Sequence, residues 1–239
     1  MTEPEVSAPA VMRNYHEVLR NDLTKVLAPL AEAADLAADL TNFSAAWSAY
    51  ARAIAVHAAM EDGVAGAGGG SSALLDHYFD GAVGAAMFKD EHAHEHTLQA
   101  AVTDAVANGG AALRTAFAAY RAMAEAHLKH EEDIMMPLVA RLPEPKAPLF
   151  ANWCLSAGIA HGGFDHFVAH GVQSLATHGS AKNTPAGATR VFVHALKAVC
   201  TPAQWTRYLP LARRAAGPEV WAAVVAEVPS LEARAEMAA

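Results

Sequence analysis

Two pairs of histidine and glutamate, each with its members one helical turn apart, occupy equivalent places in the chain. His57 precedes Glu61 by four residues, and His127 precedes Glu131 by the same spacing, 70 positions later. Residues four apart share one face of an α-helix, so each pair can present an imidazole nitrogen and a carboxylate oxygen to a single point. Such groups bind transition metals, and they also transfer protons.

Each pair ends a longer series of residues with the alternating spacing of four and three that is typical of a buried helical seam. The two series are Phe43, Trp47, Tyr50 and Ile54 before His57, and Leu113, Phe117, Tyr120 and Ala124 before His127. Each helix is therefore expected to be apolar for three turns on its buried side and then polar.

Two further segments show the opposite order. His16 precedes a seam of Leu19, Leu23, Val26 and Leu30, and His92 and His96 precede Val102 and Val106. In an up-down-up-down bundle, all four polar ends would meet at one level. The residues expected there are His16, His57, Glu61, His92, His96, His127 and Glu131.

Buried imidazoles and carboxylates without partners are unfavourable, and a metal would satisfy them together. The seven ligands contain no thiolate and are too many for one tetrahedral zinc ion. They suit two six-coordinate ions bridged by Glu61 and Glu131, with a solvent oxygen between them. A polar core satisfied by its own hydrogen bonds, or an acid–base cluster, is the alternative. The Glu-x-x-His spacing of ferritin-like proteins occurs only at Glu91 and His94, which argues against that class.

The elements that must position these residues are helices, and the predicted fold class is all-α. Four long helices are expected, at residues 10–30 with a disturbance at Pro29, 42–62 after an N-cap at Thr41, 82–107, and 111–142 with a bend at Pro137. Residues 63–72 are expected to form a flexible glycine-rich loop, and residues 74–79 a short helical insert. Residues 1–142 are predicted to form one domain, and residues 143–239 a helical extension packed on it.

Breaks between the shorter C-terminal helices are expected at Gly162-Gly163, residues 179–187, Thr201-Pro202 and Gly217-Pro218.

Composition narrows the range of partners. The chain has 239 residues, 17 Lys and Arg against 25 Asp and Glu, and a net charge of −8, which disfavours nucleic acid or an anionic membrane as partner. Two cysteines cannot build a disulfide scaffold, whereas 13 histidines are unusually many. The first ten residues lack the basic and apolar parts of a secretory signal, so a cytoplasmic location is expected.

The order of these motifs resembles the hemerythrin-like (HHE cation-binding) family over about residues 10–142. The resemblance rests on a lone His16, on His57-x-x-x-Glu61, on His92-x-x-x-His96, and on the run that starts His127-Leu-Lys-His-Glu131 and ends at Pro137. It implies two non-haem iron ions with a bridging oxo or hydroxo group. The five histidines would be terminal ligands, and the two glutamates would be bridges.

One departure from the family bears on function. Oxygen-carrying hemerythrins end the motif with His-x-x-x-x-Asp, whereas this chain has His127-x-x-x-Glu131, which favours the broader relatives. Glu91-His92 and Glu95-His96 also each fit a version of the motif with one histidine. The expected function is binding of O₂, NO or peroxide for oxygen or redox sensing, storage or iron handling. The alternative is a di-iron oxidoreductase that decomposes peroxide or oxidises a small substrate with O₂.

The sequence is compatible with more than one role for several residues. Tyr15, Tyr50 and Tyr120 are either core aromatics or electron-transfer groups, and His130 either supports His127 or is exposed. The C-terminal histidines could be exposed, or could form a second site or a proton relay: His161, His166, His170, His178 and His194. Residues 143–239 could form a lid, a substrate pocket or a dimer surface.

Overall fold

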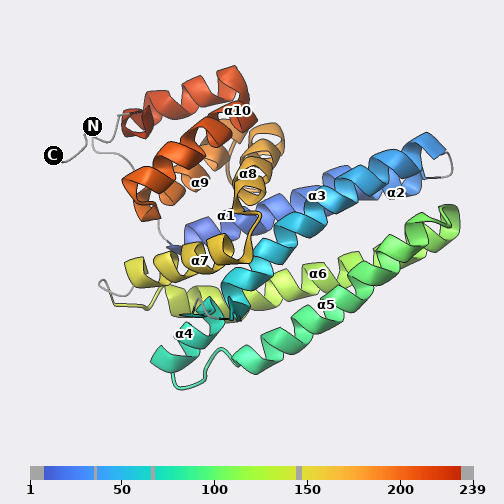
Figure 1. Cartoon of the computed structure of the whole chain (residues 1–239), viewed down its shortest axis with the longest axis horizontal. Coiled ribbons are helices and arrows are strands. Elements are labelled where there is room, and N and C mark those ends of the chain that lie inside the picture. Colours follow the sequence, from blue (N-terminus) through green and yellow to red (C-terminus); the bar gives the residue numbers. More distant parts are fainter. Residues whose placement is uncertain (1–7, 35–36, 66–67, 144–146, 233–239) are drawn as a thin grey trace.

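The computed structural model describes residues 8–34, 37–65, 68–143 and 147–232, and these residues are almost entirely helical (Figure 1). The all-α prediction is confirmed. Two strands of two residues each, β1 (Gly63–Val64) and β2 (Gly68–Gly69), pair antiparallel within the described chain. The predicted domain boundary, between residues 142 and 143, lies after the end of the fourth long helix, directly before the undescribed residues 144–146.

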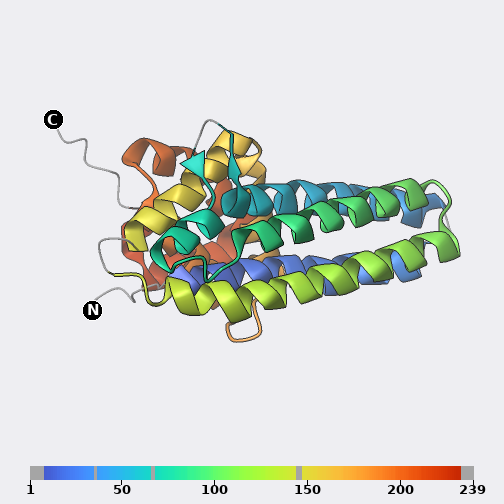
Figure 2. The same ribbon diagram turned by 90° about the horizontal axis from the view of Figure 1, so that it is seen from below.

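Four long helical rods lie side by side in the first part of the chain (Figures 1 and 2). The rods are α1 (Ala8–Asn21) continued by η1 (Asp22–Leu27) and α2 (Ala28–Glu32), then α3 (Ala37–Asp62), α5 (Ala85–Val106) and α6 (Gly110–Val139). Rods that follow one another along the chain run in opposite directions. The first rod packs on α3 and α6, and α5 packs on the same two helices. This arrangement brings one end of every rod to a common level.

The first rod is interrupted by a π-helical segment, η1, just ahead of Pro29. A proline has no N–H, and its ring clashes with the carbonyl four residues earlier in a regular α-helix. A π turn contains an extra residue and relieves this conflict locally. The predicted disturbance at Pro29 is therefore found, as a widened turn immediately before the proline.

The widened turn also moves the buried face of this rod by one residue. The spacing of four and three predicts Val26 and Leu30 in the seam, and both are only half-buried. The structure instead buries Leu27 and Ala31. The prediction was wrong beyond Leu23 because it assumed a constant helical period.

The helix α3 begins at Ala37, so the predicted N-cap at Thr41 is wrong. Thr41 lies inside the helix, in its second turn. The preceding residues are good helix formers, and Asp39 in the first turn interacts favourably with the helix dipole. Nothing in this stretch forces the helix to start as late as Thr41.

The segment predicted as a flexible loop, residues 63–72, contains the β1–β2 pair and the start of α4 (Ser71–Tyr78). It packs tightly against the end of α3. A Cβ atom on Gly70 would lie only 1.8 Å from the backbone oxygen of Glu61. Only glycine fits at this position, which brings the loop backbone against the residue that precedes the end of α3.

The start of α5 is held by a side chain from α4. The carboxylate of Asp76 accepts hydrogen bonds from the backbone N–H groups of Val83, Gly84 and Ala85, at 2.7, 3.0 and 2.7 Å. Gly84 itself has a φ of 71°, which a residue with a side chain rarely adopts. The helix consequently begins at Ala85, three residues later than predicted.

The C-terminal helices cover one side of the rods (Figure 1). They are α7 (Ala147–His161), α8 (Phe164–His178), α9 (Pro185–Val199), α10 (Pro202–Glu227) and the 3₁₀ turn η3 (Pro229–Glu232). They contact α1 and α3, and one continuous hydrophobic core joins both parts of the molecule. The predicted break at Gly162-Gly163 is confirmed by the gap between α7 and α8.

Two of the C-terminal predictions concern helix ends. The predicted break at Thr201-Pro202 is found, and there Thr201 caps α10 in a reciprocal arrangement with Gln204. Gly217 has a φ of 73° and breaks the same helix, as predicted for Gly217-Pro218.

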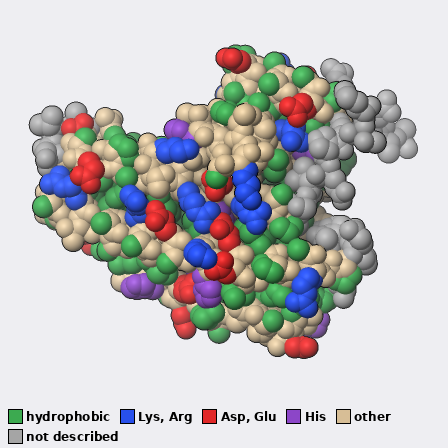
Figure 3. Space-filling view, turned by 180° about the vertical axis from the view of Figure 1, so that it is seen from behind, with side chains coloured by type: hydrophobic (Ala, Val, Ile, Leu, Met, Phe, Trp, Pro, Cys, Tyr) green, Lys and Arg blue, Asp and Glu red, His purple; other side chains and the backbone are tan. Residues whose placement is uncertain are grey.

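The distribution of charge on the surface and the length of the helices are relevant to what the protein can contact. On the face shown in Figure 3, acidic and basic side chains of the described residues are interspersed. None of the described helices combines the length and the apolar character that crossing a membrane requires.

Candidate metal centre

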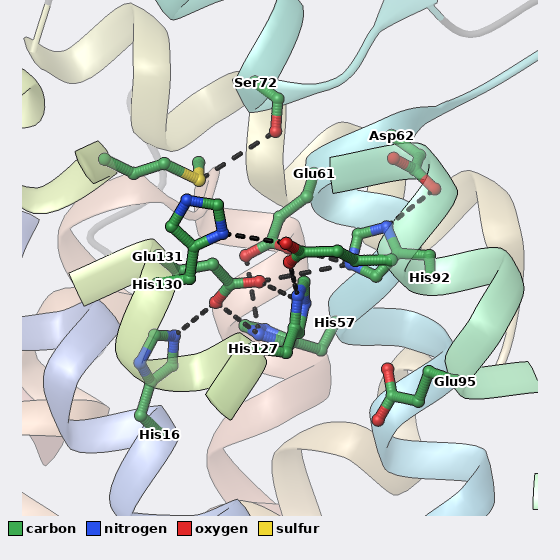
Figure 4. Close-up of polar contacts among 12 residues, drawn as sticks. His16, His57, Glu61, Asp62, Ser72, His92, Glu95, His127, His130 and Glu131 are labelled. Atoms are coloured by element: carbon green, nitrogen blue, oxygen red, sulfur yellow. Dashed lines mark hydrogen bonds and ion pairs between the residues drawn. The ribbon is translucent and has the colours of Figure 1, made fainter. Parts of the chain in front are cut away.

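Six of the seven predicted ligands lie together at the common level of the four rods (Figure 4). His16 comes from α1, His57 and Glu61 from α3, His92 from α5, and His127 and Glu131 from α6. All six are buried, and His16 and Glu131 have no exposed surface. The repeated spacing on α3 and α6 and the reversed order on α1 and α5 therefore place their polar ends at one point.

The six residues form two groups of four potential ligands that share two members. Glu61 and Glu131 belong to both groups, His16 and His57 complete one, and His92 and His127 complete the other. Within each group, one ligand atom from every residue lies within 4.8 Å of all the others. Two shared carboxylates between two histidine pairs form a donor set suited to two adjacent metal ions.

The distances are also compatible with metal binding. Nε2 of His16 lies 3.0 Å from Oε2 of Glu131, and Nε2 of His57 lies 3.4 Å from Oε1 of Glu61. Nε2 of His92 lies 3.3 Å from Oε2 of Glu61. Ligand atoms held about 2.1 Å from one ion at right angles would be about 3 Å apart.

The inward-facing atoms also lack hydrogen bonds. The buried atoms without a hydrogen-bond partner in the described structure include Nε2 of all four histidines, both carboxylate oxygens of Glu131 and one of Glu61. Buried polar atoms are nearly always satisfied in native proteins, by protein groups, water or ions. A bound metal would satisfy all of these atoms together, so the residues present fit such a group.

The outward-facing nitrogens of three of these histidines contact a second layer of carboxylates. Nδ1 of His16 lies 3.0 Å from Glu132, Nδ1 of His92 lies 2.9 Å from Asp62, and Nδ1 of His127 lies 2.7 Å from Glu91. A carboxylate that accepts the Nδ1–H bond orients the ring and leaves Nε2 free for a metal.

Sequence reasoning missed this second layer, although a signal for it was present. An acidic residue directly follows each shared glutamate, Asp62 after Glu61 and Glu132 after Glu131. In both cases the glutamate faces the centre and the following residue contacts a histidine on a neighbouring rod. The 70-residue repeat therefore includes these supporting carboxylates.

Charge in the metal-free centre is shared between histidines and carboxylates. Burial by itself lowers the pKa of His16, His92 and His127, but the adjacent carboxylates outweigh it. With Glu131 beside both, His16 and His127 have their pKa raised to about 9. His92, beside Asp62, has its pKa raised to about 11. These histidines are therefore protonated at neutral pH when no metal is bound.

The two shared carboxylates differ from one another. Burial, reinforced by the charge of Glu131, raises the pKa of Glu61. Burial also acts to raise the pKa of Glu131, but the imidazoles of His127 and His16, whose Nε2 atoms lie 2.6 and 3.0 Å from its carboxylate oxygens, outweigh it and lower that pKa well below its usual value. Glu131 is thus the more firmly ionised of the two.

The predicted ligand His96 does not join the centre, since its side chain is exposed on α5. The buried stripe of this helix runs through Phe88, His92, Glu95 and Val102. Each residue advances about 100° around an α-helix, so His96 lies beyond His92 on the solvent side of that stripe. The third helix therefore fits the version of the motif with one histidine.

Glu95 takes the buried position next to His92 but lies apart from the ligand cluster (Figure 4). Its carboxylate lies 2.8 Å from the hydroxyl of Tyr120, which lies 2.8 Å from the hydroxyl of Tyr50. Both tyrosines belong to the hydrophobic core. They are therefore core aromatics with satisfied hydroxyls, and electron transfer through them stays a prediction.

His130 supports the centre indirectly. Its Nδ1 lies 2.9 Å from one oxygen of Glu91, whose other oxygen contacts His127. The side chain is about one-third exposed. Of the two roles considered for His130, the structure favours contact with the second layer of the centre.

The C-terminal histidines lie outside both ligand groups found in the described part of the chain. Nε2 of His170 lies 2.6 Å from Asp22 in the π turn, and Nε2 of His166 lies 2.8 Å from the backbone oxygen of Ala49. These two residues join α8 to the rods. His161 is exposed, and His178 and His194 are half-buried.

Comparisons with protein-family models, with curated proteins and with solved structures found no match to this chain.

Proposed function

We propose that this chain is a hemerythrin-like protein whose four rods form an up-down-up-down bundle around two non-haem iron ions. The single observation that supports this is the pair of buried four-residue groups that share Glu61 and Glu131. The resemblance of the sequence motifs to that family supports iron as the metal, because the ligand geometry alone suits several transition metals.

In this proposal each of the six residues has a defined role in holding the two ions. His16 and His57 hold one ion, His92 and His127 hold the other, and Glu61 and Glu131 contact both. Four protein ligands per ion leave further positions of a six-coordinate ion for a small molecule. Iron bound there would supply reversible one-electron chemistry toward O₂, NO or peroxide.

The side chains around the metal centre limit which molecules reach the remaining coordination positions. The rods pack buried apolar side chains in the same core, among them Ile54, Ala124 and Leu128, which exclude bulk water. The second-layer carboxylates Asp62, Glu91 and Glu132 hold three of the histidine rings in place. We infer binding of a small ligand for oxygen or redox sensing, storage or iron handling.

A second candidate function is an oxidoreductase acting on a small substrate or on peroxide. One observation favours it: a cavity lined mainly by apolar side chains reaches His57 and Glu61. A carrier of a diatomic molecule does not require such a space beside its metal ligands.

Metal analysis of the full-length protein, purified from iron-supplemented cells, tests the proposal. Two irons per chain are expected, and a protein with His57→Ala and His127→Ala is the control that should lose them. One zinc ion per chain, or equal iron in the control, would overturn the di-iron proposal.

Stopped-flow mixing of the reduced, iron-loaded protein with O₂ separates the two functions. A stable absorption change that reverses when O₂ is removed is expected for a carrier or sensor. Rapid decay with consumption of peroxide or of an added substrate would instead establish the oxidoreductase.

A further inference from the structure

A cavity of about 150 Å³ lies where the C-terminal helices meet the rods. Its walls come from α1, α3, α7, α8 and α9, together with the start of α4. Most of the lining side chains are apolar, including Met12, Phe150, Leu155, Phe167, Phe192 and Leu196. Neither the rods nor the C-terminal helices could form this space alone.

The cavity adjoins the candidate metal centre on one side. His57 and Glu61 both contribute to its lining, and both belong to the ligand group completed by His16 and Glu131. The His57 ring also stacks near Tyr15, with 5.7 Å between ring centroids. A molecule in this cavity would therefore lie next to one half of the centre.

Few polar groups line the cavity. Tyr15 lines it, and its hydroxyl is buried without a hydrogen-bond partner in the described structure. Cys154 and Ser71 also line it. Burial raises the pKa of the Cys154 thiol to about 12, so this group stays protonated and behaves as a small apolar side chain.

We propose that this cavity binds a small apolar molecule of about the size of benzene, beside His57 and Glu61. Its volume decides the size, because apolar cavities of about 150 Å³ bind benzene or xenon. Its lining decides the polarity, because a polar molecule would lose hydrogen bonds to water that these side chains cannot replace. The buried Tyr15 hydroxyl could accommodate one polar substituent.

This inference deepens the oxidoreductase candidate by naming a substrate class, and its functional meaning rests on the proposed metal centre. It also assigns residues 147–199 a role, because helices α7, α8 and α9 supply most of the apolar wall. Binding to the cavity itself does not require metal, so the two proposals can fail separately.

Isothermal titration of the full-length, metal-free protein with benzene tests the cavity. Binding is expected for benzene and not for 1,4-dioxane, which is similar in size but polar. Ala195→Phe places a ring in the cavity and should weaken benzene binding by about tenfold or more, because the ring occupies the same space. Ala198→Phe, an exposed position on the same helix, is the matched control and should bind benzene like the unmodified protein.

A second pair of variants tests the cavity independently, so that the test does not depend on correct folding of Ala195→Phe. Ala151→Phe enters the cavity from α7, and Ala160→Phe is its exposed control on that helix. No benzene binding by the unmodified protein, or unchanged affinity in both filling variants, would overturn the cavity proposal.

The iron-loaded protein tests the position of the bound molecule. Benzene should change the absorption spectrum of the iron in the unmodified protein and in Ala198→Phe, but not in Ala195→Phe. An unchanged spectrum despite calorimetric binding would refute the placement beside His57. Absence of iron from the purified protein would refute the proposed function, while the metal-free titration would still decide whether the cavity binds benzene.

Discussion

The two halves of the candidate metal centre are equivalent in their ligands but differ in their surroundings. His92 and His127 form one half, and carboxylates of Asp62 and Glu91 contact the outward nitrogens of both rings. In the other half only His16 has such a described contact, with Glu132. The His57 ring lies near Tyr15 and faces the apolar cavity.

The 70-residue repeat explains why the two halves have equivalent ligands, and the C-terminal helices explain why their surroundings differ. Exchanging α3 with α6, and α1 with α5, maps each ligand group onto the other. Within the described residues, no carboxylate contacts the outward nitrogen of His57 as Glu91 on α5 contacts that of His127. There α7, α8 and α9 contribute apolar side chains instead. One half is thus held by charged partners, while the other half is accessible to an apolar molecule.

The largest effect is expected from a substitution that affects both halves of the metal centre. Glu131→Gln changes a residue common to both ligand groups, so the protein should lose both metal ions. The loss of affinity should exceed the roughly 10–100-fold that second-layer partners contribute. Elemental analysis measures it, with Glu125→Gln on the same helix as control. Two ions per chain in both variants would contradict the shared role of Glu131.

The next effect concerns the stability of the metal-free protein. The pKa values of His16 and His127 are raised to about 9 and that of His92 to about 11. Groups with a raised folded-state pKa contribute stability that is complete below about pH 6.5 and is lost as the pH rises through the folded values. The free energy of unfolding of the metal-free protein, measured with urea, should therefore fall between about pH 7 and pH 10.

Metal should reverse this trend, since it binds the neutral imidazoles and replaces their protons. The iron-loaded protein should keep its stability over the same pH range. A metal-free protein whose stability rises from pH 7 to pH 10 would show that these histidines are not held protonated by the carboxylates.

A smaller effect separates the halves. Asp62→Asn should weaken metal binding by the half that contains His92, and Glu132→Gln by the half that contains His16, each by about 10–100-fold. Stepwise metal titration should show one weakened step in each variant, with the exposed Asp90→Asn as control. Equal weakening of both steps in both variants would show that the halves do not bind independently.

The smallest effect is expected at His96. His96→Ala changes an exposed side chain, and such substitutions usually alter stability by less than about 0.5 kcal/mol. Metal content should be unchanged, whereas His92→Ala should lose an ion from its half. A loss of metal in His96→Ala would restore His96 as a ligand.

Sequence spacing was informative where one face of a regular helix had to be identified. It placed His57, Glu61, His127 and Glu131 correctly because residues four apart stay close on any α-helix. It could not separate His92 from His96, since both lie near the edge of the buried stripe and only the packing of α5 against its neighbours selects one of them.

The remaining features depend on contacts between distant segments. The cavity exists only because α7, α8 and α9 pack over the rods, and no local pattern encodes its shape. The shift from Val26 and Leu30 to Leu27 and Ala31 depends on where the strain from Pro29 is relieved. The spacing of apolar residues in the sequence predicts this one-residue shift of the buried face only if the position of the π turn is known.

The π turn has a consequence for how this protein tolerates change. A π segment is equivalent to a one-residue insertion in a helix. The helical turns before it and after it therefore need not share one rotational register about the axis. In the first rod it lies between His16 at the centre and Ala31 at the far end. The far end can therefore be repacked, lengthened or shortened by a residue while the imidazole of His16 keeps its orientation.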